Sequence, residues 1–120
     1  MSKKVLVIDD SPFVFKTVVK ALEGTDYIVV DNALNGQLGL EKYAEHHPDV
    51  ITLDVTMPIM DGLETAKHLF EINPDIKIIM LSAMGDEVLH NQARELGIKH
   101  FLMKPFKPQM LQDKLAEIFG

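Results

Sequence analysis

The chain has no cysteine and no tryptophan among its 120 residues. Without cysteine there is no disulfide framework, no thiolate metal site and no cysteine nucleophile. Without tryptophan, no indole ring can stack on a flavin. A chain of this length is still large enough to bury one core without covalent cross-links. We therefore expect one compact domain over residues 1–120.

Long hydrophobic runs are also missing. The first apolar run, Val5 to Ile8, is ended by Asp9 and Asp10. It is too short for a signal peptide or a membrane span. We expect a cytoplasmic protein with no membrane contact.

Basic residues are in deficit. Lys and Arg number 12 against 18 Asp and Glu, which gives a formal net charge of -6. This excess of negative charge argues against nonspecific electrostatic binding to nucleic acid or anionic lipid. Proteins and small ions are the expected partners. The sequence also shows no linker, internal repeat or low-complexity stretch that would divide the chain.

Short apolar runs without hydrophobic/polar alternation predict strands that are covered on both faces. They are Val5 to Ile8, Ile28 to Val30, Val50 to Leu53 and Ile76 to Leu81, with Phe101 to Met103 as a fifth. Residues with helical spacing separate them and continue after the last, around Val14–Leu22, Leu38–Tyr43, Leu63–Phe70, Val88–Leu96 and Leu111–Ile118. Five strand-helix units predict a doubly wound, five-stranded parallel α/β sheet of the flavodoxin-like type, with strand order 2-1-3-4-5.

Proline and glycine mark the expected helix ends. Ser11 followed by Pro12 is a good cap and first-turn pair, while Gly24, Pro48, Pro74 and Gly97 close helices or block their continuation. These positions support the division into five units.

Polar residues follow the predicted strands at the edge where ligands bind in such sheets. They are Asp9, Asp10, Asp54, Ser82 and Lys104. Three converging carboxylates would repel one another by several kcal/mol unless a cation intervenes, and Mg²⁺ prefers such oxygen ligands. Lys104 and Ser82 can donate hydrogen bonds to an anion over Asp54. The set predicts phosphoryl transfer, with Asp54 as the nucleophile.

The sequence resembles the receiver domains of response regulators over nearly its whole length. Four separate motifs carry the resemblance: Asp9-Asp10; Asp54 with Met57-Pro58-x-Met60-Asp61-Gly62; Ser82-Ala83; and Lys104-Pro105-Phe106. Each motif is weak alone, but together they are highly specific.

The resemblance implies a role for each site residue. Asp54 is the phosphoacceptor, and it holds Mg²⁺ together with Asp10 and the backbone carbonyl of Thr56, while Asp9 acts through the metal's water shell. Lys104 pairs with the phosphoryl group, and the Lys104-Pro105 bond is expected to be cis.

The resemblance also implies a switch. Ser82 binds a phosphoryl oxygen and is coupled to the side chain of Phe101, so that the fourth helix, fifth strand and fifth helix form the output face. Thr56 and Met84 lie at the positions that tune dephosphorylation. Met84 offers a water only a weak acceptor, so slow self-dephosphorylation is expected, with a separate phosphatase where rapid reset is needed.

A narrower likeness is to the single-domain CheY-type chemotaxis regulators, through Ser82-Ala83-Met84-Gly85 and the end of the chain after the fifth predicted helix. It implies a monomeric signalling switch rather than an enzyme. The expected partners are a histidine kinase or histidine phosphotransfer protein and a downstream protein such as the flagellar motor switch. The alternative is a receiver domain from a larger, for example DNA-binding, response regulator.

Two other function classes fit less well. Phosphohydrolases of the haloacid dehalogenase class have an Asp-x-Asp motif, in which the first carboxylate is the nucleophile and the second is the general acid and base. In this chain Thr56 stands at the position of the second carboxylate. A flavodoxin-type electron carrier needs hydroxyls and amides after the first strand, where this chain has two aspartates.

Single residues also have plainer interpretations. Ser82 can cap the next helix, and Phe101 can be a core strand residue. Adjacent His46 and His47 point in different directions on a helix and are interpreted as solvated surface residues. Phe15, where the family tends to place a basic residue, either packs locally or is exposed as a kinase contact.

Overall fold

The computed structural model describes residues 2–83 and 85–120. Strands and helices alternate five times along it, as predicted. The elements are β1 (Lys3–Ile8), α1 (Pro12–Ala21), β2 (Tyr27–Ala33), α2 (Gly36–His46), β3 (Val50–Asp54), α3 (Gly62–Ile72), β4 (Ile78–Ser82), α4 (Glu87–Leu96), β5 (His100–Met103) and α5 (Pro108–Phe119).

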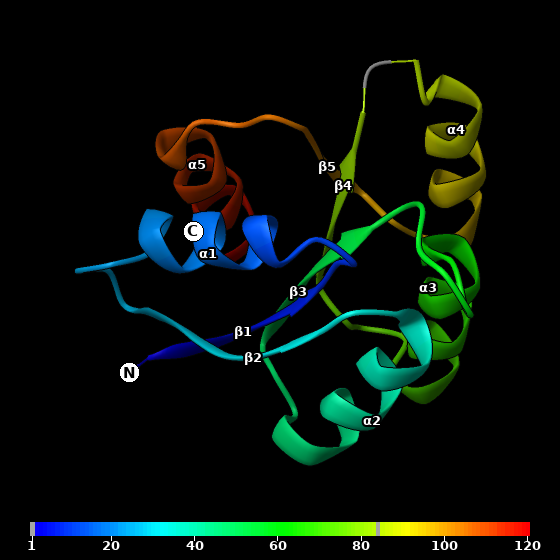
Figure 1. The fold of residues 1–120 in the computed structure, drawn as a ribbon, viewed down its shortest axis with the longest axis horizontal. Coiled ribbons are helices and arrows are strands. Elements are labelled where there is room, and N and C mark those ends of the chain that lie inside the picture. Colours follow the sequence, from blue (N-terminus) through cyan, green and yellow to red (C-terminus); the bar gives the residue numbers. More distant parts are fainter. Residues whose placement is uncertain (1, 84) are drawn as a thin grey trace.

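The strands form one parallel sheet in the order β2-β1-β3-β4-β5. Helices α1 and α5 cover one face, and α2, α3 and α4 cover the other (Figure 1). The predicted flavodoxin-like doubly wound fold is confirmed. Because all strands run the same way, their carboxyl ends meet at one edge of the sheet, which we call the carboxyl edge.

Successive residues of the central strands enter opposite layers of the core. Leu6 and Ile8 of β1 pack in the cluster under α2 and α3, whereas Val5 and Val7 pack in the cluster that includes α1 and α5 residues. All four side chains are fully buried. The absence of alternation in this run therefore reflects cover on both faces, as predicted. The edge strand β2 differs, since Ile28 is half exposed.

Every observed strand differs from its predicted run by one to three residues at one or both ends, and two of these differences have a clear cause. The strand expected at Ile76 begins at Ile78, because the Ile76 amide donates to the Asn73 carbonyl (3.1 Å) in a turn. The strand expected to end at Val30 continues to Ala33, although Asp31 and Asn32 are polar. Its pairing with β1 continues past an irregularity in register, which adds backbone hydrogen bonds that propensity alone does not predict.

The helix ends agree only partly with the predicted signals. Ser11 occupies the N-cap position and Pro12 opens α1, but the Ser11 side chain makes no capping hydrogen bond. Its amide instead donates to Asp9 Oδ1 (2.9 Å). Gly97 ends α4 with φ 114°, a left-handed conformation that favours glycine. No helix in the described residues is long and apolar enough to span a membrane.

Candidate functional site

The predicted site residues lie where the strands end. Asp9 follows β1, Asp54 is the last residue of β3, Ser82 is the last residue of β4, and Lys104 follows β5. The sheet order makes β1 and β3 neighbours, so Asp9 and Asp54 come from adjacent strands. The carboxyl edge therefore gathers residues that are far apart in sequence.

Three carboxylates share this edge. Asp9, Asp10 and Asp54 each offer an oxygen, and these oxygens lie within 4.8 Å of one another. Asp9 and Asp54 are buried, at 2% and 7% exposure, while Asp10 is exposed. Burial, with the nearby charge of Asp9, raises the pKa of Asp54 to about 6 despite the opposing effect of Lys104. Asp54 thus still ionises near neutral pH.

Lys104 joins two of these carboxylates. Its Nζ lies 2.8 Å from Asp9 Oδ2 and 3.2 Å from Asp54 Oδ1. Burial opposes its charge, but the two carboxylates outweigh that effect and raise the pKa of Lys104. Within the described residues, Asp9 Oδ2 is buried and accepts no hydrogen bond of favourable geometry, so its contact with Lys104 is an ion pair. The Lys104-Pro105 peptide bond is cis, as predicted.

The loop after Asp54 folds back tightly on the strand. The Gly62 amide donates to the Val55 carbonyl (2.8 Å), and a Cβ on Gly62 would overlap the Asp54 carbonyl oxygen. The Asp61 side chain caps α3 by accepting from the Glu64 amide (2.9 Å). Thr56, whose carbonyl is a predicted metal ligand, is exposed at the start of this loop. Glycine is thus required where the loop approaches Asp54.

Ser82 does not contact the carboxylates in the described structure. It is 2% exposed, and its Oγ lies 2.6 Å from Nε2 of His90 on α4. The alternative that Ser82 caps the next helix is wrong, because Asp86 occupies the N-cap position of α4. Its predicted role toward a phosphoryl group stays a prediction.

Phe101 lies next to the same histidine. The His90 and Phe101 ring centroids are 4.7 Å apart, and the Arg94 guanidinium lies 4.9 Å from the Phe101 centroid. Phe101 also packs against the core at half burial. His90 is therefore the residue that connects the two predicted switch positions.

Sequence reasoning missed His90. The spacing of His90 and Arg94, four residues apart on a predicted helix, puts them on one face. That spacing alone does not show which strand residues the face covers. The contacts with Ser82 and Phe101 depend on how α4 packs on β4 and β5.

Two other predictions concern single positions. Met84 lies outside the described residues. Phe15 is half buried and packs against the core cluster of α1 and α5, so the packing interpretation holds for it. The exposed aromatic of α1 is Phe13, at 79% exposure, which shares a groove with Pro105 and Phe106.

A second charged cluster lies on β2 and α2. Asp31, Glu45 and His46 offer ligand atoms within 4.8 Å, but the Lys42 ammonium already lies 3.1 Å from Asp31. The solvated interpretation is confirmed for His47, which is exposed, and holds only in part for His46, whose ring is partly exposed and has its Nε2 2.9 Å from Asp31 Oδ2. A lysine takes the position that a cation would need.

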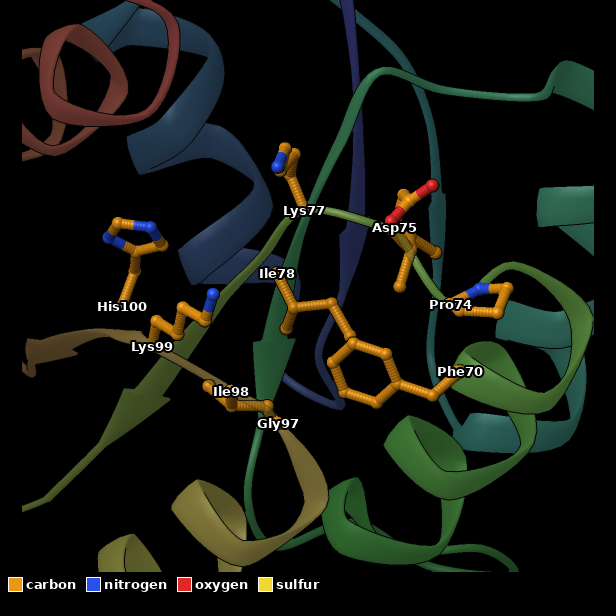
Figure 2. Close-up of a pocket in the computed structure, with 10 residues that line it drawn as sticks. Phe70, Pro74, Asp75, Lys77, Ile78, Gly97, Ile98, Lys99 and His100 are labelled. Carbon is orange, nitrogen blue, oxygen red and sulfur yellow. The ribbon is translucent and has the colours of Figure 1, made fainter.

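A small cavity of about 120 Å³ lies at the opposite, amino edge of the sheet (Figure 2). Its lining comes from the ends of α3 and α4 and the residues that precede or begin β4 and β5, including Phe70, Ile78 and Gly97, with Lys77 and Lys99 among them. It contains none of the predicted site residues. The cavity and the carboxyl edge are thus separate features of one sheet.

Comparisons with known proteins agree with this geometry. Residues 5–116 match the response regulator receiver domain family. The chain is 37% identical over 118 residues to the chemotaxis protein CheY of Thermotoga maritima, with 98% of each chain covered. It is 45% identical over 108 residues to a protein-glutamate methylesterase/protein-glutamine glutaminase of Halalkalibacterium halodurans, covering 88% of this chain but 31% of that protein.

Solved structures show the same fold. The crystal structure of the CheX-CheY-BeF3-Mg²⁺ complex from Borrelia burgdorferi is similar with a TM-score of 0.91 and 31% identity, covering 98% of this chain and 90% of that one. Family match, relatives and fold agree over nearly the whole chain. The chain belongs to the response regulator receiver domain family and is a CheY-like receiver.

Proposed function

We propose that this receiver accepts a phosphoryl group on Asp54 from a histidine kinase or histidine phosphotransfer protein, with Mg²⁺ bound. Residues 1–120 act as one receiver domain in this proposal. The observation that carries it is the position of Lys104, whose ammonium contacts both buried carboxylates, Asp9 and Asp54. Two buried acids and a cation at one strand edge are costly to fold and are typical of a functional site.

The donor set fits Mg²⁺. Asp9, Asp10 and Asp54 bring three carboxylates together, and the single ammonium of Lys104 leaves the group net negative. All the offered ligand atoms are oxygens, which Mg²⁺ prefers. Asp10, Asp54 and the Thr56 carbonyl would hold the ion, and Asp9 would act through its water shell. When bound, the ion would neutralise charge on the phosphoryl oxygens.

The chain's own residues position the transfer. An oxygen of ionised Asp54 forms a bond to phosphorus while the phosphorus–nitrogen bond of the donor phosphohistidine breaks, and the nitrogen keeps the electron pair. Lys104 is placed to shift from Asp54 to the arriving phosphoryl oxygens, a charge-assisted contact. Phosphoryl transfer depends mainly on positioning and electrostatics. A carboxylate nucleophile and an ammonium group beside it are therefore the types of group that the transfer needs from the protein. Multiple turnover is not proposed.

The output is a change in a protein-binding face. Ser82 would bind a phosphoryl oxygen. The equilibrium between conformations of Phe101 and α4 would then shift toward the one that binds the partner. Beside them, a groove lined by Met103, Met110 and other residues of β5 and α5 offers half-exposed apolar side chains. The downstream partner is a protein, and the CheY relatives make the flagellar motor switch the first candidate.

Donor docking belongs to a different face. Phe13 of α1, with Pro105 and Phe106, forms an apolar groove that Lys104 also lines. A phosphohistidine must approach Asp54 beside Lys104, so this groove lies where the donor protein passes. Phe13, rather than Phe15, is the proposed kinase contact. Phe13→Ala should slow transfer from the kinase and leave transfer from acetyl phosphate unchanged; equal slowing of both would reject docking.

The phosphoryl group is proposed to be long-lived. Thr56 has a short hydroxyl and Met84 has only a weak acceptor, so neither replaces an amide or carboxylate in orienting an attacking water. A separate phosphatase would then provide rapid reset. The double variant Thr56→Asn, Met84→Glu should shorten the phosphoryl lifetime at saturating Mg²⁺, and a lifetime unchanged or longer would refute water positioning at these residues.

A second arrangement is that this receiver is one part of a longer regulator. The Halalkalibacterium relative favours it, since the match there covers under a third of that protein. In either arrangement we propose a cytoplasmic monomer without direct nucleic-acid or membrane binding, in line with the net charge of -6.

Labelling by a small phosphodonor tests the proposal. Acetyl phosphate with Mg²⁺ should label the protein at one site, and removal of Mg²⁺ by a chelator should prevent it. Asp54→Asn should abolish labelling, whereas Asp31→Asn, in the second charged cluster, should not. Labelling that persists in Asp54→Asn, for example acid-labile but base-stable labelling on a histidine, would overturn the mechanism.

A further inference from the structure

The Ser82 hydroxyl contacts α4 rather than the carboxylates of the carboxyl edge. Its oxygen lies 2.6 Å from His90 Nε2, and within the described residues this is its one hydrogen bond. In the His90 tautomer that carries its proton on Nδ1, Nε2 accepts this hydrogen bond from the Ser82 hydroxyl.

A serine hydroxyl has a single proton to donate. While Ser82 donates it to His90, it has none for a phosphoryl oxygen on Asp54. The two acceptors thus compete for one hydroxyl. The burial of Ser82, at 2% exposure, leaves little water to take part in the exchange.

The same imidazole is packed on Phe101. Its ring lies 4.7 Å from the Phe101 ring with 32° between the planes, and Arg94 of the next helical turn covers Phe101 at 4.9 Å. A neutral imidazole can accept a hydrogen bond from Ser82 while it packs on Phe101.

We infer that His90 is a positioning residue that holds the Ser82 hydroxyl against α4 in the unphosphorylated protein, so that a phosphoryl group on Asp54 must take Ser82 from it. This inference rests on the proposed phosphoacceptor function. The Ser82–His90 bond stabilises the resting state and lowers the affinity for a phosphoryl group. Its loss also frees the ring that packs on Phe101, which joins the two switch positions in one step.

A purely packing role for His90 makes a different prediction. His90→Phe keeps an aromatic ring over Phe101 but removes the acceptor nitrogen. His90→Gln reaches the position of Nε2 with an amide that can accept from Ser82. If His90 only packs, the affinity for a phosphoryl mimic depends on the ring; if His90 holds Ser82, it depends on the acceptor.

Calorimetric titration with beryllofluoride at saturating Mg²⁺ distinguishes the two roles. His90→Phe should bind the mimic about fivefold more tightly than the wild type, the effect of losing one hydrogen bond of ordinary net strength. His90→Gln should bind like the wild type. In a Ser82→Ala background, His90→Phe should change nothing, because the hydroxyl under competition is gone.

The inference fails if His90→Phe binds no more tightly than the wild type, or if the same gain persists in the Ser82→Ala background. Amide NMR spectra establish that each variant is folded, and His90→Leu decides by the same criteria if His90→Phe does not fold. A wild type that does not bind beryllofluoride with Mg²⁺ overturns the proposed function, and the inference with it. If the wild type binds beryllofluoride and every His90 variant binds it with the same affinity, the inference is overturned but the proposed function is not.

Discussion

The two edges of the sheet end the same strands in opposite ways. At the carboxyl edge, β1 and β3 lead into buried Asp9 and Asp54, which share the Lys104 ammonium. At the amino edge, the charged side chains Lys77 and Lys99 are exposed, and the cavity between α3, α4 and β4 has apolar side chains such as Ile78 in its wall.

This difference shows where the fold tolerates a cost. Burying a carboxylate is unfavourable unless it is paired, and packing alone does not require charge at a strand end. At the amino edge, the charged side chains beside the strands stay exposed to water, so the sheet does not need buried charges at its ends. The buried charges at the carboxyl edge are therefore best explained by a role in binding or phosphoryl transfer. Substitutions at the two edges should accordingly have effects of different size.

The largest expected effect is steric. Gly62→Ala places a methyl group against the Asp54 carbonyl and the Val55 backbone, and should lower the free energy of unfolding by about 3 kcal/mol. Gly24→Ala, in the loop before β2 at the amino edge, meets no atom within 4 Å and suffers only from its φ of 76°, which costs about 1 kcal/mol. Urea unfolding of both variants measures the difference. Equal losses would show that the loop after Asp54 is no more tightly fitted than an open turn.

The next effect depends on pH. The folded state raises the pKa of Asp54 from its ordinary 3.8 to about 6, so it binds that proton more tightly than the unfolded chain does. The stability contributed by this group is complete below pH 3.8 and is lost as pH rises toward 6. Asp54→Asn, which resembles the neutral acid, should therefore be more stable than the wild type at neutral pH by about 1 to 2 kcal/mol, after allowance for screening by water.

Chemical unfolding across pH in the presence of a chelator measures this effect. The advantage of Asp54→Asn should shrink as pH falls through 6 toward 4. Asp75→Asn, at the rim of the amino-edge cavity, is the control and should alter the profile little, because its carboxylate is exposed. An Asp54→Asn advantage that stays constant with pH would contradict the assignment of the shift to Asp54.

The smallest effect concerns metal binding. Mg²⁺ at about ten times its dissociation constant should stabilise the wild type by about 1.4 kcal/mol. Asp10→Ala should remove most of this gain, since its carboxylate belongs to the carboxyl-edge cluster. Asp31→Ala should keep it, because Lys42 serves that second cluster. Thermal unfolding with and without Mg²⁺ compares the three proteins, and an unaltered response of Asp10→Ala would remove Asp10 from the metal's ligands.

Much of the fold could be predicted because each buried strand is recognisable from its own short run of apolar residues. The run from Val5 to Ile8 is apolar on both faces and ends at two aspartates, so its type and end were both predictable. Ile76 was misassigned because a buried turn residue and a buried strand residue have the same hydrophobicity. Asp31 and Asn32 were missed because pairing with β1, not their own propensity, keeps them in β2.

The carboxyl edge was predictable for a topological reason. Parallel strands bring their ends to one edge, and the order 2-1-3-4-5 makes β1 and β3 neighbours, so Asp9 and Asp54 were expected to lie close together. Lys104 follows β5, two strands away from β3, and its long side chain reaches both carboxylates. The Ser82–His90 contact was not predictable in that way, because it depends on the rotation of α4 about its own axis. The functional roles of these residues remain predictions for experiment.

The most direct test of the account is to locate the phosphoryl group chemically. After treatment with acetyl phosphate and Mg²⁺, borohydride reduces an aspartyl phosphate to homoserine, which peptide mass spectrometry assigns to one residue. The account predicts homoserine at position 54 and at no other aspartate, including Asp31 and Asp75 away from the carboxyl edge. Unmodified Asp54 in protein that carries a phosphoryl group, or homoserine at another aspartate, would contradict the account.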